Sequence, residues 1–176
     1  GVQTCALPIY DIRNLSRIVR TELRLEQVNL SELAQRVAGE LVQMQPDRKI
    51  DLQIAPHLIA LGDKNLLRLV FENLLGNAFR FTRHQADACI EFGMNPIDGH
   101  ATYYVRDNGT GLDMADDPDS FNPYQILQRP DAHSSADIGL ATVQRIINRL
   151  GGRVWAEGSH EQGAMFCFTL RDKDDQ

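Results

Sequence analysis

The strongest constraint on the fold of this chain is the apolar segment that follows Asp63. Apolar side chains recur there at helical spacing: Leu66, Leu67, Leu69, Val70, Leu74 and Leu75. Aspartate is a residue type that caps helix N-termini, because its carboxylate accepts hydrogen bonds from the first free N–H groups. The pattern therefore predicts a long helix that begins after Asp63.

Polar residues interrupt this apolar helix at Glu72, Asn73, Asn77 and Arg80. Asn73 and Asn77 are one turn apart, so both amides lie on the same face. Amides are poor residues for the middle of a helix, which leaves two interpretations. The cluster is either a solvated polar face or a set of oxygen ligands for Mg²⁺ with an acid and a cation beside it. Magnesium keeps several waters, so one amide oxygen and phosphate oxygens would suffice.

A second polar cluster, Asp107-Asn108-Gly109-Thr110-Gly111, stands where an apolar strand runs into a loop. Alone, it is a weak signal, because an aspartate can form a turn and the glycines can be simple hinges. No helix opens directly after it, so it is not a dinucleotide-binding fingerprint. Paired with the amide-bearing helix, it is interpreted as the other wall of a nucleotide pocket.

The other segments predict an α+β fold. Helical repeats cover residues 11–27, a second segment that Asn29 or Ser31 can cap and that Pro46 ends, and residues 138–150, which two glycines stop. Strand patterns cover residues 49–54, 58–61, 88–94, 102–106, 153–157 and 164–170, with turns at 96–99 and 159–163. Between residues 108 and 137 the periodicity fails, which predicts a lid or binding loop. The expected architecture is a two-layer α/β sandwich with helices on one face of a mixed, mainly antiparallel sheet.

Charge and composition exclude several classes of function. The net charge of -6 leaves no basic stripe for nucleic-acid phosphates, so no nucleic acid is expected as a partner. No apolar run approaches the about eighteen residues of a membrane span, so this fragment is expected to make no membrane contact. Cys5, Cys89 and Cys167 are widely spaced and indicate a reducing compartment, with the last two as small buried strand residues. The five histidines lack metal-ligand spacing, so none is assigned a metal.

The two clusters and two further motifs resemble the ATP-binding catalytic domain of sensor histidine kinases. This domain belongs to the GHKL superfamily and has the Bergerat ATP-binding fold, which gyrase, Hsp90 chaperones and MutL share. Residues 72–82 are similar to its N box and residues 107–111 to its G1 box. Phe121 matches its F box, and Ile138-Gly139-Leu140 matches the end of its G2 box. The four boxes occur in the family's order and spacing between residues 29 and 170.

The resemblance implies ATP and Mg²⁺ as cofactors and assigns roles to single residues. Asp107 would accept a hydrogen bond from the adenine amino group, and Asn77 would hold Mg²⁺ through its side-chain oxygen. Asn73 would support the phosphates or the metal, and Arg80 would pair with phosphate charge. Glu72 would orient or deprotonate the attacking group. The remaining nucleotide-binding positions are Gly109, Gly111, Phe121, Gly139 and Leu140.

The chain departs from the family pattern at two places. The G2 box usually reads Gly-x-Gly-x-Gly-Leu, but Ser135 and Asp137 replace the first two glycines. The Asp137 carboxylate would repel a triphosphate about 4 Å away by roughly 4 kcal/mol at an effective dielectric constant near 20, which predicts weak ATP binding. Alternatively, Asp137 turns away and caps a helix at Ile138. The second departure is the missing phospho-accepting histidine, which in the family precedes this domain.

The resulting domain prediction has four parts. Residues 1–9 are a non-native or disordered leader, 10–27 the end of a dimerisation helix, 28–171 the ATP-binding domain and 172–176 a disordered tail. The full protein is expected to be a cytoplasmic homodimer that moves the γ-phosphoryl group of ATP to a histidine and then to a response regulator receiver domain. That histidine would belong to a dimerisation domain of the same protein. The alternative is a degenerate, non-catalytic ATPase-like module for regulation or interaction.

Overall fold

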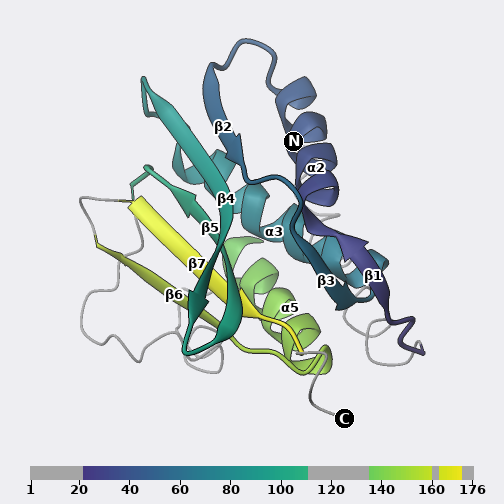
Figure 1. Cartoon of the computed structure of the whole chain (residues 1–176). Helices are drawn as coiled ribbons and strands as arrows, with labels where there is room; N and C mark the ends of the chain where they lie inside the picture. The colour runs from purple at the N-terminus through teal and green to yellow at the C-terminus, as the bar shows by residue number, and fades with distance from the viewer. Residues whose placement is uncertain (1–21, 111–134, 160–162, 172–176) are drawn as a thin grey trace.

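The computed structural model describes residues 22–110, 135–159 and 163–171. Helices and strands form two layers, with the helices on one face of the main sheet (Figure 1). In chain order the described elements are β1 (Glu26–Asn29), α2 (Leu30–Met44), β2 (Ile50–Ile54), β3 (Ile59–Gly62), α3 (Lys64–Phe81), β4 (Ala88–Ile97), β5 (His100–Asp107), α5 (Ser135–Arg149), β6 (Val154–Ser159) and β7 (Gly163–Thr169).

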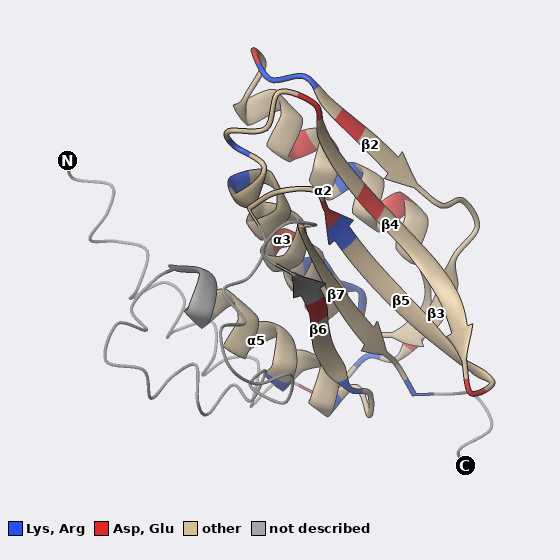
Figure 2. Ribbon diagram, turned by 90° about the vertical axis from the view of Figure 1, so that its left-hand side faces the viewer, with Lys and Arg blue, Asp and Glu red and all other residues tan. Residues whose placement is uncertain are grey.

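The main sheet has the strand order β2-β4-β5-β7-β6. The β2–β4 pair is parallel, and the β4–β5, β5–β7 and β6–β7 pairs are antiparallel. The sheet is thus mixed and mainly antiparallel, which confirms the predicted α+β sandwich. Figure 2 marks charged positions along strands of this sheet, such as the red segments of β2 and β4. Arg106 Nη1 of β5 lies 3.6 Å from Glu91 Oε2 of β4.

Helix α3 is packed onto the middle of the sheet by aromatic contacts. The Phe71 ring meets the Phe92 ring of β4 edge-on, with centroids 4.9 Å apart, and the Phe168 ring of β7 at 6.4 Å. All three side chains are fully buried. Edge-to-face geometry adds roughly 0.5–1.5 kcal/mol to the apolar burial of each such pair. These contacts fix the amide-bearing helix relative to the strand that ends at Asp107.

Both predicted helix caps are present. The Asn29 side chain accepts a hydrogen bond from the Glu32 N–H (3.1 Å), and Asp63 Oδ1 accepts from the N–H groups of Asn65 (3.0 Å) and Leu66 (3.2 Å). Ser31, the other candidate cap, instead lies inside the first turn of α2. Its buried hydroxyl donates to the Ala55 carbonyl (2.6 Å) and so ties α2 to the segment after β2.

The predicted helix over residues 11–27 is wrong at its end. Residues 22–25 are irregular and Glu26–Asn29 forms β1, while residues 11–21 lie outside the described residues. Strand β1 pairs antiparallel with β3, with Glu26 opposite Gly62. Its hydrogen bonds go to a segment about thirty residues later, so local helical periodicity gives no sign of them.

Three smaller expectations are corrected. Strand β4 extends to Ile97, so the hairpin turn is Asp98-Gly99 rather than residues 96–99, and both have the positive φ of a tight two-residue turn. Helix α5 begins at Ser135 instead of Ile138. Cys167 is buried as predicted, but Cys89 is only half-buried; both thiols are free. None of the helices within the described ranges combines the length and apolar character that a membrane crossing requires.

Candidate nucleotide site

The Asn73 amide of α3 faces Gly139 of α5. Asn73 Nδ2 donates to the Leu69 carbonyl one turn earlier (2.8 Å). Its Oδ1 atom points at Gly139, where an added Cβ would lie only 2.5 Å away. Glycine at position 139 therefore lets the start of α5 approach Asn73. The structure thus places Gly139, a predicted nucleotide-binding residue, beside Asn73 of the helix that is predicted to bear the metal ligand.

Asn77 carries a buried side-chain atom without a hydrogen-bond partner in the part of the chain that the structure describes. Its side chain is only 7% exposed, and Oδ1 accepts a hydrogen bond from Arg80 Nη2 (3.2 Å). Its Nδ2 atom is buried without a hydrogen-bond partner. An unpaired buried donor costs roughly 1–3 kcal/mol, so proteins rarely keep one without a functional reason. An amide at this position suits a ligand that completes its bonding.

The donor set around Asn77 fits Mg²⁺ only in company with a nucleotide. The residue offers one carboxamide oxygen, which is the hard type of donor that Mg²⁺ prefers. Among the residues that the structure describes, no three or more His, Cys, Asp or Glu side chains form a group able to hold a metal ion. A cation at Asn77 would therefore take its other ligands from phosphate oxygens and water.

Arg80 extends from the last turn of α3 beside this amide. Arg80 is an exposed residue. Its guanidinium lies 5.1 Å from the centroid of the Phe81 ring, donates a hydrogen bond to Asn77 Oδ1 and makes further interactions. A planar guanidinium matches phosphate oxygens in geometry as well as charge. The Arg80 side chain could therefore contact a bound phosphate while it stays beside the Asn77 amide.

Asp107 ends β5 as a buried carboxylate. It is 2% exposed, and its Oδ1 accepts a hydrogen bond from the Gly109 N–H (2.9 Å). Burial raises the pKa of Asp107 to about 6, against the opposing effect of backbone N–H groups of Gly109 and Ala164. A buried carboxylate with few donors is a strong acceptor for a ligand N–H. It would distinguish an exocyclic amino group from a carbonyl oxygen.

The loop after Asp107 contacts the C-terminal end of α3, and this contact brings the two polar clusters close together. The Thr110 N–H donates to the Phe81 carbonyl (3.2 Å). An added Cβ at Gly109 would lie 2.5 Å from that same carbonyl oxygen, so no larger residue fits without a shift. Asp107 and the C-terminal end of α3 therefore lie close together in the structure.

The structure does not bring Glu72 together with the two asparagines. Glu72 Oε1 pairs with Arg68 Nε (2.7 Å), and Arg68 Nη2 pairs with Glu40 Oε2 of α2 (2.7 Å). The Glu72 side chain is 39% exposed. It lies in an ion-pair network between α2 and α3, and its predicted catalytic role stays a prediction.

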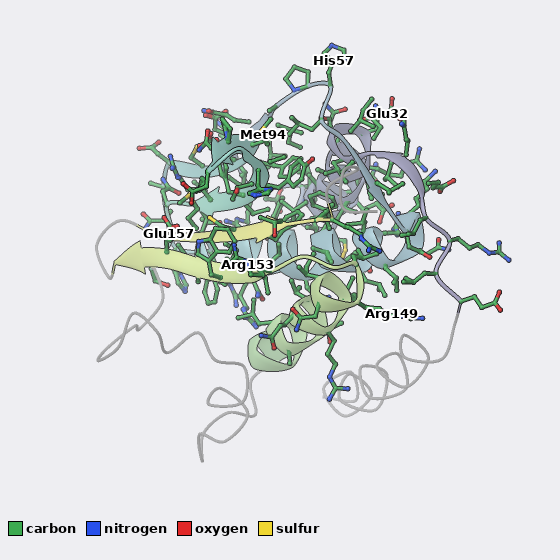
Figure 3. All side chains as sticks on the ribbon, turned by 60° about the horizontal axis from the view of Figure 1, so that its bottom comes forward. Glu32, His57, Met94, Arg149, Arg153 and Glu157 are labelled. Atoms are coloured by element: carbon green, nitrogen blue, oxygen red, sulfur yellow. The ribbon has the colours of Figure 1, made fainter. Side chains whose placement is uncertain are left out.

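The remaining predicted nucleotide-binding positions are Leu140, Gly111 and Phe121. Leu140 is buried in the hydrophobic core, while Gly111 and Phe121 lie outside the described residues. Asp137 lies within the first turn of α5, because the helix begins at Ser135, and is therefore not its N-cap. His57 stands on the exposed loop between β2 and β3, pointing away from the helices in Figure 3.

Sequence analysis missed two residues that support the site. The Arg48 guanidinium donates to the carbonyls of Phe79 (2.7 Å) and Thr82 (2.9 Å), so it closes the C-terminal end of α3. Asn108 binds the backbone at the start of β4 through both ends of its carboxamide. Neither contact is visible in the chain, since each joins segments about twenty or more residues apart.

Comparison with known proteins identifies this arrangement. Residues 62–174 match the family model described as "Histidine kinase-, DNA gyrase B-, and HSP90-like ATPase". The chain belongs to this family. It is an ATP-binding catalytic domain of the sensor histidine kinase type, as the four motifs indicated.

Relatives with the same domain are much longer than this chain. It is 28% identical to cyanobacterial phytochrome B of Nostoc sp. over 93% of its own length and 22% of that protein's. It is 29% identical to the adaptive-response sensory kinase SasA of Synechococcus sp., over 92% of its own length and 44% of that protein's. The chain thus spans from about a fifth to less than half of these relatives.

Solved structures agree with the fold. Full-length ShkA, solved in complex with AMPPNP, superposes with a TM-score of 0.72 and 28% identity over 94% of this chain and 35% of that protein. The mycobacterial sensor histidine kinase MprB superposes with a TM-score of 0.64 over 84% of this chain and 97% of that one; at 21% identity it supports the fold alone.

Proposed function

We propose that the site holds Mg–ATP, and that the full protein uses it to phosphorylate a histidine. The observation that carries the proposal is the closeness of a buried acceptor, Asp107, to the end of α3, where the buried Nδ2 of Asn77 has no hydrogen-bond partner; the Phe81–Thr110 contact joins the two segments. The carboxylate suits the adenine amino group at one end. The amide and Arg80 suit phosphate and its metal at the other.

The residues of this chain would act by positioning and by charge neutralisation, as in phosphoryl transfer generally. Asp107 would fix the base, Asn77 would offer its oxygen to Mg²⁺, and Arg80 would pair with phosphate. When bound, the cation would neutralise phosphate charge. Asn73 lies one turn before Asn77 on the same helix, with its Oδ1 facing Gly139 of α5, and would support the phosphates or the metal.

The partners follow from this chemistry. A histidine nitrogen on a dimerisation domain of the same protein would form the new N–P bond as the bond to ADP breaks, with loss of the imidazole proton. The phosphoryl group would then pass to a receiver domain of a response regulator. We infer a cytoplasmic homodimer as the working form. The resemblance to SasA and to other sensor kinases supports this inference.

A thermal-shift titration with ATP and Mg²⁺ tests the site. A ligand that binds only the folded state stabilises it by about 2.7 kcal/mol at a hundred times its Kd, so the melting temperature should rise in the wild type. The rise should require Mg²⁺ and be lost in Asn77→Ala. Asn65→Ala, in the exposed first turn of the same helix, is the matched control and should behave as the wild type. A wild type without any shift would refute ATP binding.

A second candidate function is a degenerate module that no longer transfers phosphate. It is favoured by Ser135 and Asp137, which occupy the first turn of α5 where the family has glycines. A transfer assay with γ-labelled ATP and the histidine-containing domain of the same protein distinguishes the kinase from the degenerate module. Label on the histidine supports the kinase, whereas ATP binding without transfer supports the degenerate module.

A further inference from the structure

Asn108 continues the β4–β5 hydrogen-bond ladder after the backbone of β5 has left the sheet. The regular pairing reaches Asp107, which stands opposite Ile90. One residue later, the Asn108 N–H still donates to the Cys89 carbonyl (3.2 Å). The Cys89 N–H, however, donates to the Asn108 side chain at Oδ1 (2.8 Å).

The other end of the same side chain is also used. Asn108 Nδ2 donates to the Asp87 carbonyl (2.8 Å) in the turn before β4. A carboxamide carries the same donor and acceptor as a peptide group. The side chain therefore takes the place of the peptide that a longer β5 would have supplied, and the backbone is released to turn.

That turn is what shapes the adenine end of the site. Directly after Asn108, the Gly109 N–H donates to the Asp107 carboxylate, and Gly109 is pressed against the Phe81 carbonyl. The Asp107 carboxylate is thus held between two anchors. One is the Asn108 clamp on β4, and the other is the loop contact on α3.

We propose that Asn108 is a positioning residue that fixes Asp107 for recognition of the adenine amino group. The inference rests on the proposed Mg–ATP site. Asn108 is exposed, and both polar ends of its side chain bind backbone groups of residues 87 and 89, so its effect on a nucleotide is exerted through Asp107. Asparagine alone fits, because aspartate lacks the donor, glutamine is one methylene too long and serine is too short.

Calorimetric titration of the full chain with Mg–ATP and Mg–ITP tests this role. ITP carries a 6-oxo group where ATP carries the 6-amino group that Asp107 would read. Loss of both backbone hydrogen bonds should raise the Kd for ATP about tenfold in Asn108→Ala, equivalent to about 1.4 kcal/mol. The Kd for ITP should change by less than about twofold, since the amino-directed contact is absent from it.

Two further variants sharpen the comparison. Asn108→Asp keeps the acceptor for Cys89 but offers no donor to the Asp87 carbonyl, so ATP should bind as weakly as to the alanine variant. This near-isosteric variant keeps the test available even if the alanine variant fails to fold. Asn95→Ala, an exposed asparagine on the same hairpin, is the control and should keep both Kd values.

The outcomes separate the two levels of the proposal. Unchanged ATP affinity in Asn108→Ala, or a parallel loss for ATP and ITP, would overturn the positioning role while leaving the ATP site standing. Wild-type ATP affinity in Asn108→Asp would overturn the two-ended clamp. A wild type that binds neither nucleotide would overturn the proposed function, and the inference with it.

Discussion

Asp107 is expected to reduce the stability of the nucleotide-free protein near neutral pH. Its carboxyl is 2% exposed, and burial raises its pKa from 3.8 to about 6. Above pH 6 the folded protein must keep a charge in a poorly solvated position, whereas the unfolded chain keeps it in water. The difference between 3.8 and about 6, at about 1.4 kcal/mol per pH unit, corresponds to about 3 kcal/mol at pH 7.

The sign follows from proton linkage. The folded state holds the proton more tightly, so protonation favours folding, and this destabilisation disappears as the pH falls from about 6 to 3.8. Asp107→Asn removes the charge and keeps one acceptor oxygen for the Gly109 N–H. We therefore expect the variant to be more stable than the wild type at pH 7.5, by up to about 3 kcal/mol, with the advantage lost near pH 4.

Urea unfolding of both proteins between pH 4 and 8 measures this difference directly. The difference cancels the titration of the other carboxyl groups, so its pH dependence reports Asp107 alone. Asp98→Asn, on the exposed hairpin turn, is the control and should stay within about 0.5 kcal/mol of the wild type. A wild-type minus Asp107→Asn difference that does not change with pH would refute the reasoning. Asp107→Asn should also lose ATP binding, since stability and recognition oppose each other at this carboxyl.

Three other substitutions test the surroundings of the site. Arg48→Ala should lower the free energy of unfolding by about 2 kcal/mol in urea titration, because charge-assisted hydrogen bonds to two carbonyls at the C-terminal end of α3 are lost. A change below about 0.5 kcal/mol, the size of an ordinary surface substitution, would show that Arg48 does not hold this end of the helix. Gly139→Ala should weaken ATP binding in the thermal-shift assay, because its Cβ would displace the Asn73 carboxamide; unchanged affinity would show that α5 can retreat. Glu72→Gln should cost less than about 1 kcal/mol and leave ATP affinity intact, as expected of an exposed ion pair; lost ATP binding would place Glu72 in the site.

Local chemistry made much of the fold predictable. Asn29 and Asp63 were recognisable as caps because capping needs only a side-chain acceptor a few residues before the N–H groups that it binds. The spacing of Asn73 and Asn77 placed both amides on one helical face. The Gly151 stop after α5 was likewise visible, because its positive φ favours glycine.

Contacts between distant segments were not predictable. Helical periodicity extends the first predicted helix to Gln27, but Glu26–Asn29 forms strand β1, whose partner β3 lies about thirty residues later. Glu72 was grouped with Asn73 by adjacency, but neighbouring helical positions point about 100° apart, and Arg68 and Glu40 hold it towards α2. Arg48 and Asn108 carried no signal, since their partners are backbone groups that any residue provides.

The sequence by itself determined the layers, the helix faces and the side-chain types present on α3 and at the end of β5. These follow from periodicity and side-chain chemistry, which are properties of short segments. Only the tertiary structure decided that Gly109 rests on the Phe81 carbonyl, that Gly139 faces Asn73, and that the buried Nδ2 of Asn77 has no hydrogen-bond partner. Packing brings those groups together, and burial and desolvation depend on every element around a residue rather than on the residue itself.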